Sequence, residues 1–399
     1  MGEFAVVTDE WFDGVARQAG PVTFLVRDGR LAEVSGGDAG AGLAARGLEV
    51  RRGGFLMPGL VDAHVHLFLD GAPTDGKRRA ELMQQPLEQL VATARSSARQ
   101  ALACGVTLLR DAGDRHGINN RVRAESLRAD SGLPRIRSGG LGLKRAKRYG
   151  AFMAIDVTDA ASIRASVADL AASNDEIKLI LTGIIDFQAG AVTDPPQFTL
   201  EEARVVVEAA HAAGRKVFAH CSGAEGLAIA VQAGIDSIEH GFFMSREILA
   251  HMRDNDMAWT PTFCPVHFQW AHPEAAGWPP ATVANLRRIL DQHATQLQQA
   301  HAMGVRLLLG TDAGSMGVVH GQAVRQEIGR FVEAGVPLAA ALTAATAAPR
   351  RHFGVEGSRL QPGVPFDAAL FAGSPFERLE HLAAPLATWV APAAGTSLS

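Results

Sequence analysis

The sequence has few cysteines, little net charge and no long hydrophobic run, and each shortage excludes a class of protein. Its 399 residues include 3 cysteines, which are too few and too widely spaced for a disulfide framework. No uninterrupted apolar stretch is long enough to cross a membrane. A net charge of -4 gives no general attraction to nucleic acid or to an anionic membrane. We therefore expect no nucleic-acid partner and no membrane partner.

The first ten residues also lack the features of a secretory signal, because they are acidic and contain no positive start followed by an apolar core. With so few cysteines, this favours a protein of the reducing cytoplasm. Solenoid repeats, low-complexity tracts and blocks of one charge are missing as well. What remains is an ordinary globular composition, 47% hydrophobic and 20% charged, with enough apolar surface for a core.

The pattern of hydrophobic residues divides the chain into three parts. Residues 1–57 contain short strand-like pieces separated by Asp-Gly and Gly-Gly turns, as in a small β module. Within residues 58–355, brief apolar runs alternate with longer amphipathic segments. The runs are residues 60–63, 106–109, 135–138, 177–180, 217–219, 235–238, 257–260 and 305–309. Residues 356–399 carry one more run, 368–371, which we expect to complete the β module from the other chain end.

The amphipathic segments between the runs are typical of helices. One extends from Leu200 to Gly214, with Thr199 placed as its N-cap and Gly214 as its stop. Eight strand and helix units in succession predict an α/β fold, a closed (β/α)8 TIM barrel with a small β-sandwich module built from both chain termini. The alternative is an open doubly wound sheet, but the Gly-rich phosphate loop that usually follows its first strand is absent.

Six polar residues lie at or just after the apolar runs, where a barrel would bring them together. They are His64, His66, Lys178, His220, His240 and Asp312. Barrel enzymes carry their active sites at the carboxyl ends of the strands, and these residues fall at the ends of strands one, four, five, six and eight. Residues i and i+2 of a strand share a face, so His64 and His66 can bind one ion. The set predicts a hydrolytic centre that binds two divalent metal ions, for which Zn²⁺ is the expected identity.

The motifs around these residues resemble those of the metal-dependent amidohydrolase superfamily. The matching segments are Met-Pro-Gly-Leu-Val-Asp-Ala-His-Val-His at 57–66, Ile177-Lys178, His220, Ile-Glu-His-Gly at 238–241 and Gly-Thr-Asp-Ala-Gly at 310–314. This resemblance spans nearly the whole chain. The stretch from Thr193 to His240, with Phe-Thr-Leu-Glu-Glu at 198–202, is similar to the branch that holds prolidase-like Xaa-Pro and Xaa-Arg dipeptidases and related amidases.

The resemblance implies a role for each matching residue. His64, His66 and Asp312 would bind the more buried metal, and His220 and His240 the more exposed one. Lys178 would bridge the two as a carbamate formed with carbon dioxide, because an ammonium group has no lone pair for a metal. Burial beside cations lowers the pKa of a lysine and makes the neutral, reactive amine accessible.

The implied reaction is hydrolysis of an amide or peptide C–N bond in a small substrate, such as an N-acyl amino acid or a dipeptide. The nucleophile would be a hydroxide that bridges the two metals. Asp312 would accept its proton and pass it to the leaving amine. Asp312, Lys178 and His240 are therefore the expected catalytic residues of a binuclear metal-dependent amidohydrolase.

The loop after the third predicted strand carries the clearest sign of substrate preference. Residues 139–149 include four basic residues and the only tyrosine of the chain, but not the His-rich pattern expected of the dipeptidase branch. Basic side chains offer charge-assisted donors to a carboxylate. We therefore expect Arg145, Arg148, Tyr149 and His320 to contact a substrate that carries a carboxylate. A solvated loop explains the basic residues equally well, and His320 is equally compatible with an ordinary loop position.

Other activities would use much the same barrel. A lactone hydrolase or a phosphotriesterase-like hydrolase of organophosphate esters is the main alternative. A deaminase fits less well, because deaminases generally work with one metal and no bridging lysine, whereas Lys178 is present here. A non-enzymatic scaffold is disfavoured, since all six ligand positions are filled. We expect a homo-oligomer that acts on a small molecule.

Overall fold

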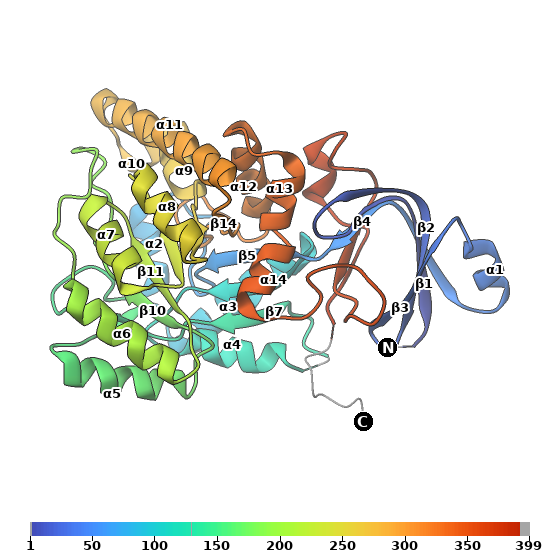
Figure 1. Cartoon of the computed structure of the whole chain (residues 1–399), viewed down its shortest axis with the longest axis horizontal. Coiled ribbons are helices and arrows are strands. Elements are labelled where there is room, and N and C mark those ends of the chain that lie inside the picture. Colours follow the sequence, from blue (N-terminus) through green and yellow to red (C-terminus); the bar gives the residue numbers. More distant parts are fainter. Residues whose placement is uncertain (1, 129, 392–399) are drawn as a thin grey trace.

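The computed structural model describes residues 2–128 and 130–391, and a barrel of short parallel strands lies at its centre (Figure 1). The strands in chain order are β5 (Leu60–Val65), β6 (Val106–Asp111), β7 (Arg135–Ser138), β10 (Ile177–Ile180), β11 (Val217–Cys221), β12 (Ser237–His240), β13 (Ala258–Thr260) and β14 (Arg306–Leu307). Each overlaps one of the eight predicted apolar runs. Most of their residues are buried, as expected of strands that are covered on both faces.

Two parallel sheets make up this barrel, in the orders β5-β6-β7 and β14-β13-β12-β11-β10-β8-β9. Backbone hydrogen bonds close it at both seams. The amide of Ala63 in β5 donates to the carbonyl of Leu309 beyond β14 at 2.9 Å, and the amide of Asp175 donates to the carbonyl of Ser138 in β7 at 3.0 Å. The predicted (β/α)8 barrel is confirmed.

Helices pack around the outside of the barrel (Figure 1). The longer ones are α3 (Leu87–Ala103), α4 (Ile118–Ser126), α5 (Ala160–Ala171), α6 (Leu200–Ala212), α7 (Ala224–Ala233), α8 (Arg246–Asp254), α11 (Pro280–Met303) and α12 (Gln322–Glu333). The shorter ones are α2 (Gly76–Met83), α9 (Cys264–Ala271), α10 (Pro273–Ala276), α13 (Leu338–Ala344), α14 (Ala347–Phe353) and η1 (Leu379–Ala383). Helix α1 (Gly40–Ala45) instead lies beside the N-terminal strands, away from the barrel (Figure 1). Within the described residues, no helix combines the length and the apolarity needed to cross a bilayer.

Helix α6 illustrates how the local sequence sets these boundaries. The side chain of Thr199 accepts a hydrogen bond from the amide of Glu202, whose own side chain accepts from the amide of Thr199, so both form a capping box. Ala203, Val206 and Ala210 are buried, at the spacing of one helical face. The predicted N-cap is confirmed.

Both chain ends contribute to the small β module, as predicted. Its six strands are β1 (Phe4–Phe12), β2 (Arg17–Arg27), β3 (Arg30–Gly36), β4 (Glu49–Pro58), β15 (Ala368–Phe371) and β16 (Ala387–Trp389), hydrogen-bonded in the order β16-β15-β4-β1-β2-β3. The aromatic rings of Phe4 and Trp389 stack with centroids 5.7 Å apart, so the first and last strands share one core. The module lies at the end of the molecule opposite α5, α6 and α7 (Figure 1).

Part of the segment expected to be a loop, residues 139–149, is in fact a strand. Residues Gly142–Lys144 form β8, which pairs in parallel with β10 and with β9 (Ala154–Asp156). Its three residues are buried. The glycines near this strand interrupt the apolar pattern, so the search for apolar runs did not predict it.

A buried ion pair joins the β module to the end of the barrel where the strands begin. Arg350 in α14 donates to the carboxylate of Asp367 at 2.8 Å, and Arg135 in β7 donates to the other oxygen of Asp367 at 2.8 Å. The side chains of Arg350 and Asp367 are both 0% exposed. Neither charge can be solvated by water if its partner is removed.

We expect Asp367→Ala to lower the free energy of unfolding by about 3–5 kcal/mol, because it leaves the buried Arg350 and the partly buried Arg135 without their carboxylate. Urea unfolding followed by circular dichroism measures the change. Glu49→Ala, which removes an exposed ion pair with Arg51 in the same β module, is the control and should leave the unfolding midpoint unchanged. Equal midpoints for both variants would show that the Asp367 cluster contributes nothing.

Candidate metal centre

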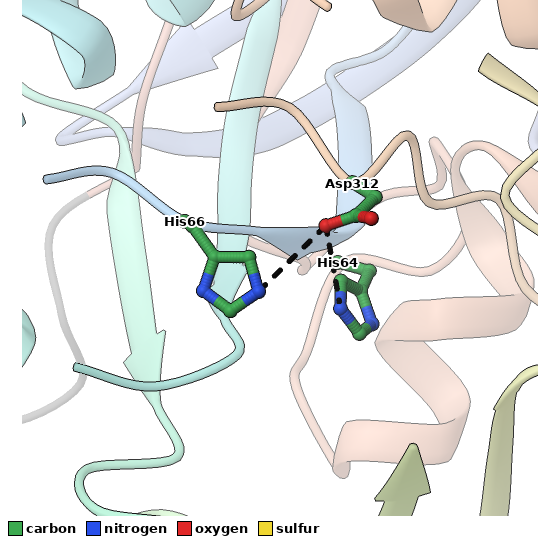
Figure 2. Close-up of side chains that lie close together, drawn as sticks. All are labelled: His64, His66 and Asp312. Carbon is green, nitrogen blue, oxygen red and sulfur yellow. Dashed lines mark ion pairs between the residues drawn. The ribbon is translucent and has the colours of Figure 1, made fainter. Parts of the chain in front are cut away.

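Three of the predicted ligands meet at the carboxyl ends of β5 and β14 (Figure 2). The Oδ1 atom of Asp312 lies 3.8 Å from Nε2 of His64 and 3.7 Å from Nε2 of His66. One potential ligand atom from each residue lies within 4.8 Å of the others. These distances are too long for hydrogen bonds, but they are close to the ~3.3 Å between ligand atoms of a tetrahedral ion with bonds of ~2.0 Å. The three residues are arranged as a candidate metal site.

His220 at the end of β11 and His240 at the end of β12 lie beside this group. Their ring centroids are 4.5 Å apart, and the ring of His240 is 5.0 Å from that of His64. All four histidines, Asp312 and Lys178 line a single cavity of about 210 Å³. The structure therefore brings all six predicted ligand positions to one place.

A buried chain of hydrogen bonds orients His64. Its Nδ1 atom is 2.6 Å from Oε2 of Glu239, so its Nε2 atom is left free to face Asp312. Glu239 also accepts from the guanidinium of Arg110 at 2.7 Å and from the hydroxyl of Ser237 at 2.6 Å. A carboxylate behind a histidine fixes the ring and increases its basicity toward a metal.

Two of the other histidines also have a hydrogen-bond partner at Nδ1. Nδ1 of His66 lies 3.0 Å from the carbonyl oxygen of Gly113, and Nδ1 of His240 lies 2.7 Å from the hydroxyl of Thr262. Burial lowers the pKa of His66 and of His220 to about 3, so both rings are neutral at physiological pH. Neutral imidazole offers the lone pair that a metal requires.

Lys178 in β10 stands out because its ammonium nitrogen has no hydrogen-bond partner among the described residues. The side chain is fully buried, and Nζ lies 4.8 Å from the centre of the Phe218 ring. Burial lowers the pKa of this lysine to about 8. A substantial fraction of the amine is therefore neutral near physiological pH.

Asp312 and His240 share an unusual backbone conformation. Their φ angles are 55° and 68°, in the left-handed region that non-glycine residues seldom adopt, and Thr262 beside His240 has a φ angle of 51°. Backbone strain of this kind persists only where the surrounding structure holds it in place, and it is often found at functional sites. Here the amide of Asp312 donates to the carbonyl of His64 at 2.8 Å.

Burial raises the pKa of the Asp312 carboxyl to about 7.

Of the four residues expected to contact substrate, only Tyr149 lines the cavity, with its ring centroid 5.1 Å from that of His220. The guanidinium of Arg145 donates to the carbonyl of Val157 at 2.8 Å and pairs with Glu202. Arg148 donates to the carbonyl of Pro195. His320 is buried next to the backbone of His66, outside the cavity lining. Neither arginine lines the cavity, and contact of either one with a substrate stays a prediction.

Several residues that shape the site were not singled out from the sequence. Glu239 was visible in the Ile-Glu-His-Gly motif, and an acidic residue inside an apolar run was the available signal. Arg110 gave the same kind of signal at the end of the second run. Thr262 and the carbonyl of Gly113 gave none, because their role depends on which loops meet at the barrel mouth.

The fold and the site together define a barrel with a candidate metal centre at the carboxyl ends of its strands. The model of the amidohydrolase family matches residues 55–393, and the chain belongs to this family. The resemblance to the amidohydrolase superfamily that we inferred from the motifs is confirmed. Prolidase-like proteins are among the solved structures that share this fold.

Three similar proteins illustrate the relationship. An uncharacterized protein of Mycobacterium tuberculosis is 30% identical over 308 residues, which cover 76% of this chain and 76% of that protein. A crystal structure of a Xaa-Pro dipeptidase with bound methionine has a TM-score of 0.81 at 24% identity and covers 96% of this chain and 97% of its own. The crystal structure of Aspergillus niger ochratoxinase has a TM-score of 0.80 at 21% identity, with coverages of 98% and 95%.

Proposed function

We propose that this protein is a metal-dependent hydrolase that cleaves the C–N bond of an amide in a small substrate. The observation that carries the proposal is the convergence of four histidines, a carboxylate and a buried lysine on one cavity. Among the described residues, this lysine has no hydrogen-bond partner. Membership of the amidohydrolase family supports it. So does the similarity in fold to a Xaa-Pro dipeptidase.

The residues present fit a pair of divalent metal ions. His64, His66 and Asp312 would hold one ion, and His220 and His240 the other. Zinc is the proposed identity of both ions. A buried amine without a hydrogen-bond partner is costly unless it is modified or neutral. Carbamylation of Lys178 would remove this cost and provide two oxygen ligands between the sites. Divalent ions bound there would lower the pKa of a water molecule and polarise the scissile carbonyl.

The protein's own groups would then manage the proton. Water adds its oxygen to the carbonyl carbon, and its proton passes to the carboxylate of Asp312, which faces the same cavity. Asp312 would then release this proton to the leaving nitrogen as the C–N bond breaks. The products are a carboxylic acid and an amine. Glu239 and Thr262 would keep His64 and His240 in position throughout.

Assays of the metal-loaded protein with N-acyl amino acids, dipeptides, other amides, lactones and phosphotriesters test the activity. Hydrolysis of amides at rates well above those for lactones and phosphotriesters is the expected result. A protein that prefers lactones or phosphotriesters would contradict the proposal and favour the ester-hydrolase alternative.

We expect purified protein to contain about two divalent metal ions per chain, because six ligand positions are too many for one tetrahedral ion. His220→Ala should lower the content to about one and abolish most activity. Elemental analysis by mass spectrometry measures both. His301→Ala, on the outer helix α11, is the matched control and should keep two ions. Full activity with a single ion per chain would contradict the two-metal proposal.

A further inference from the structure

The wall of the cavity beyond the candidate ligands is largely apolar. It is formed by side chains from three loops and from helix α9, namely Leu69, Phe152, Met153, Ile185, Phe187 and Val266. This wall directly adjoins the candidate metal centre, since the ring of Phe152 is 6.2 Å from that of His66 and 6.0 Å from that of Tyr149. A substrate amide at the metals would therefore place its substituents against aromatic and aliphatic carbon.

The same cavity offers no spare positive side chain. Among the described residues that line it, Lys178 is the only lysine or arginine, and it lies fully buried in β10 among the candidate ligands. Arg145 is held by Glu202 and Val157, and Arg148 by Pro195. A substrate carboxylate in contact with the apolar wall would lose its hydration without gaining a charged partner, which is unfavourable.

We propose that the substrate is an uncharged amide whose aryl or branched alkyl group packs against this wall, rather than an N-acyl amino acid or a dipeptide with a free carboxylate. This inference rests on the proposed C–N hydrolysis and names its substrate class. Burial of apolar surface supplies the binding free energy, and the candidate metal centre supplies the polar contacts with the amide group.

Two anilides of the same shape test the substrate class. In 4-isopropylacetanilide and 4-acetamidobenzoate, the scissile amide is the same and the para substituents are similar in size, but only the second is charged. The para position keeps the carboxylate away from the metals when the amide is bound there. We expect kcat/KM for the isopropyl compound to be about tenfold higher or more. The uncharged 4-acetamidobenzamide separates the effect of charge from that of polarity.

A charge placed at the cavity mouth should reverse this preference. Ile184 lines the cavity and is 57% exposed, so an arginine at this position can remain solvated. We expect Ile184→Arg to raise kcat/KM for 4-acetamidobenzoate relative to the isopropyl compound by about tenfold. Leu386→Arg is the matched control, because Leu386 is equally exposed at 57% and does not line the cavity. It should leave the ratio unchanged.

The outcomes separate this inference from the proposed function. Equal or better hydrolysis of the carboxylate compound by the wild-type protein would overturn the inference while supporting C–N hydrolysis. A loss confined to the carboxylate compound in Arg148→Ala would overturn it as well. If the metal-loaded, folded protein hydrolyses neither these compounds nor the other amides assayed, the proposed function fails. Calorimetric titration of the same protein with both compounds then decides the inference, and tighter binding of the carboxylate compound would overturn it.

Discussion

Replacing Lys178 by alanine is expected to abolish most activity. Mutation of a residue that only supports a metal ligand typically costs about 10–100-fold, and the loss of a group that bridges two metals should exceed this. The buried amine has no other partner among the described residues, so it does not serve a competing structural ion pair. Steady-state kinetics and metal analysis of the variant measure the effect together.

Chemical rescue distinguishes a bridging carbamate from a lysine that acts in another way. Acetate or propionate should partly restore activity to Lys178→Ala, because either can occupy the vacated space with two oxygen ligands. Carbon-13 NMR of the wild-type protein in labelled bicarbonate should show a carbamate signal that the variant lacks. Lys216→Ala, at the opposite end of the barrel, is the control. Unchanged turnover in Lys178→Ala would show that the lysine has no part in the reaction.

Asp312→Asn is the second substitution with a large expected effect. It keeps the size of the side chain but removes the proton acceptor, which costs about 10²–10⁴-fold in kcat, or more because a candidate metal ligand is altered as well. Metal analysis shows how much of the loss comes from missing ions. Asp254→Asn, at the exposed end of α8, is the control. Wild-type rates for Asp312→Asn at neutral pH would refute the assigned role.

The leaving group provides a second measurement of the role of Asp312. A nitroaniline departs readily without being protonated first, whereas an alkyl amine must receive its proton as the C–N bond breaks. Asp312→Asn should therefore lose more activity on an alkyl amide than on the corresponding nitroanilide. Equal losses on both would place the function of Asp312 in metal binding alone.

The barrel and the six candidate ligands were accessible from the sequence because both depend on local patterns. A buried parallel strand is a short apolar run, and the carboxyl ends of such strands meet at one edge, so a polar residue that ends a run can be placed in space. This rule alone was enough to predict that His220 and Asp312 lie at that edge. Strand β8 was missed because its Gly-Leu-Lys sequence has too little apolar character.

Contacts between segments that are distant in the sequence could not be predicted from it. Arg145 looked like a residue of the barrel mouth, but its partner Glu202 lies 57 residues further along the chain, and no local pattern indicates that pairing. Likewise Glu239 is hydrogen-bonded to His64, although the two residues are 175 positions apart in the sequence. Which way a long side chain turns depends on what neighbouring loops offer it. Of the residues chosen from the sequence, the six candidate ligands and Tyr149 line the cavity, whereas Arg145, Arg148 and His320 do not.

The position of the β module has a practical consequence for handling the protein. Strand β5 begins beside the module, where the amide of Gly59 donates to the carbonyl of Asp367, and it runs away from there toward His64. The first and last strands of the described chain, β1 and β16, both belong to the module. An affinity tag, a fluorophore or a solid support joined near either strand would face away from the barrel mouth. Immobilisation through the module should thus leave the entrance to the cavity open to dissolved compounds.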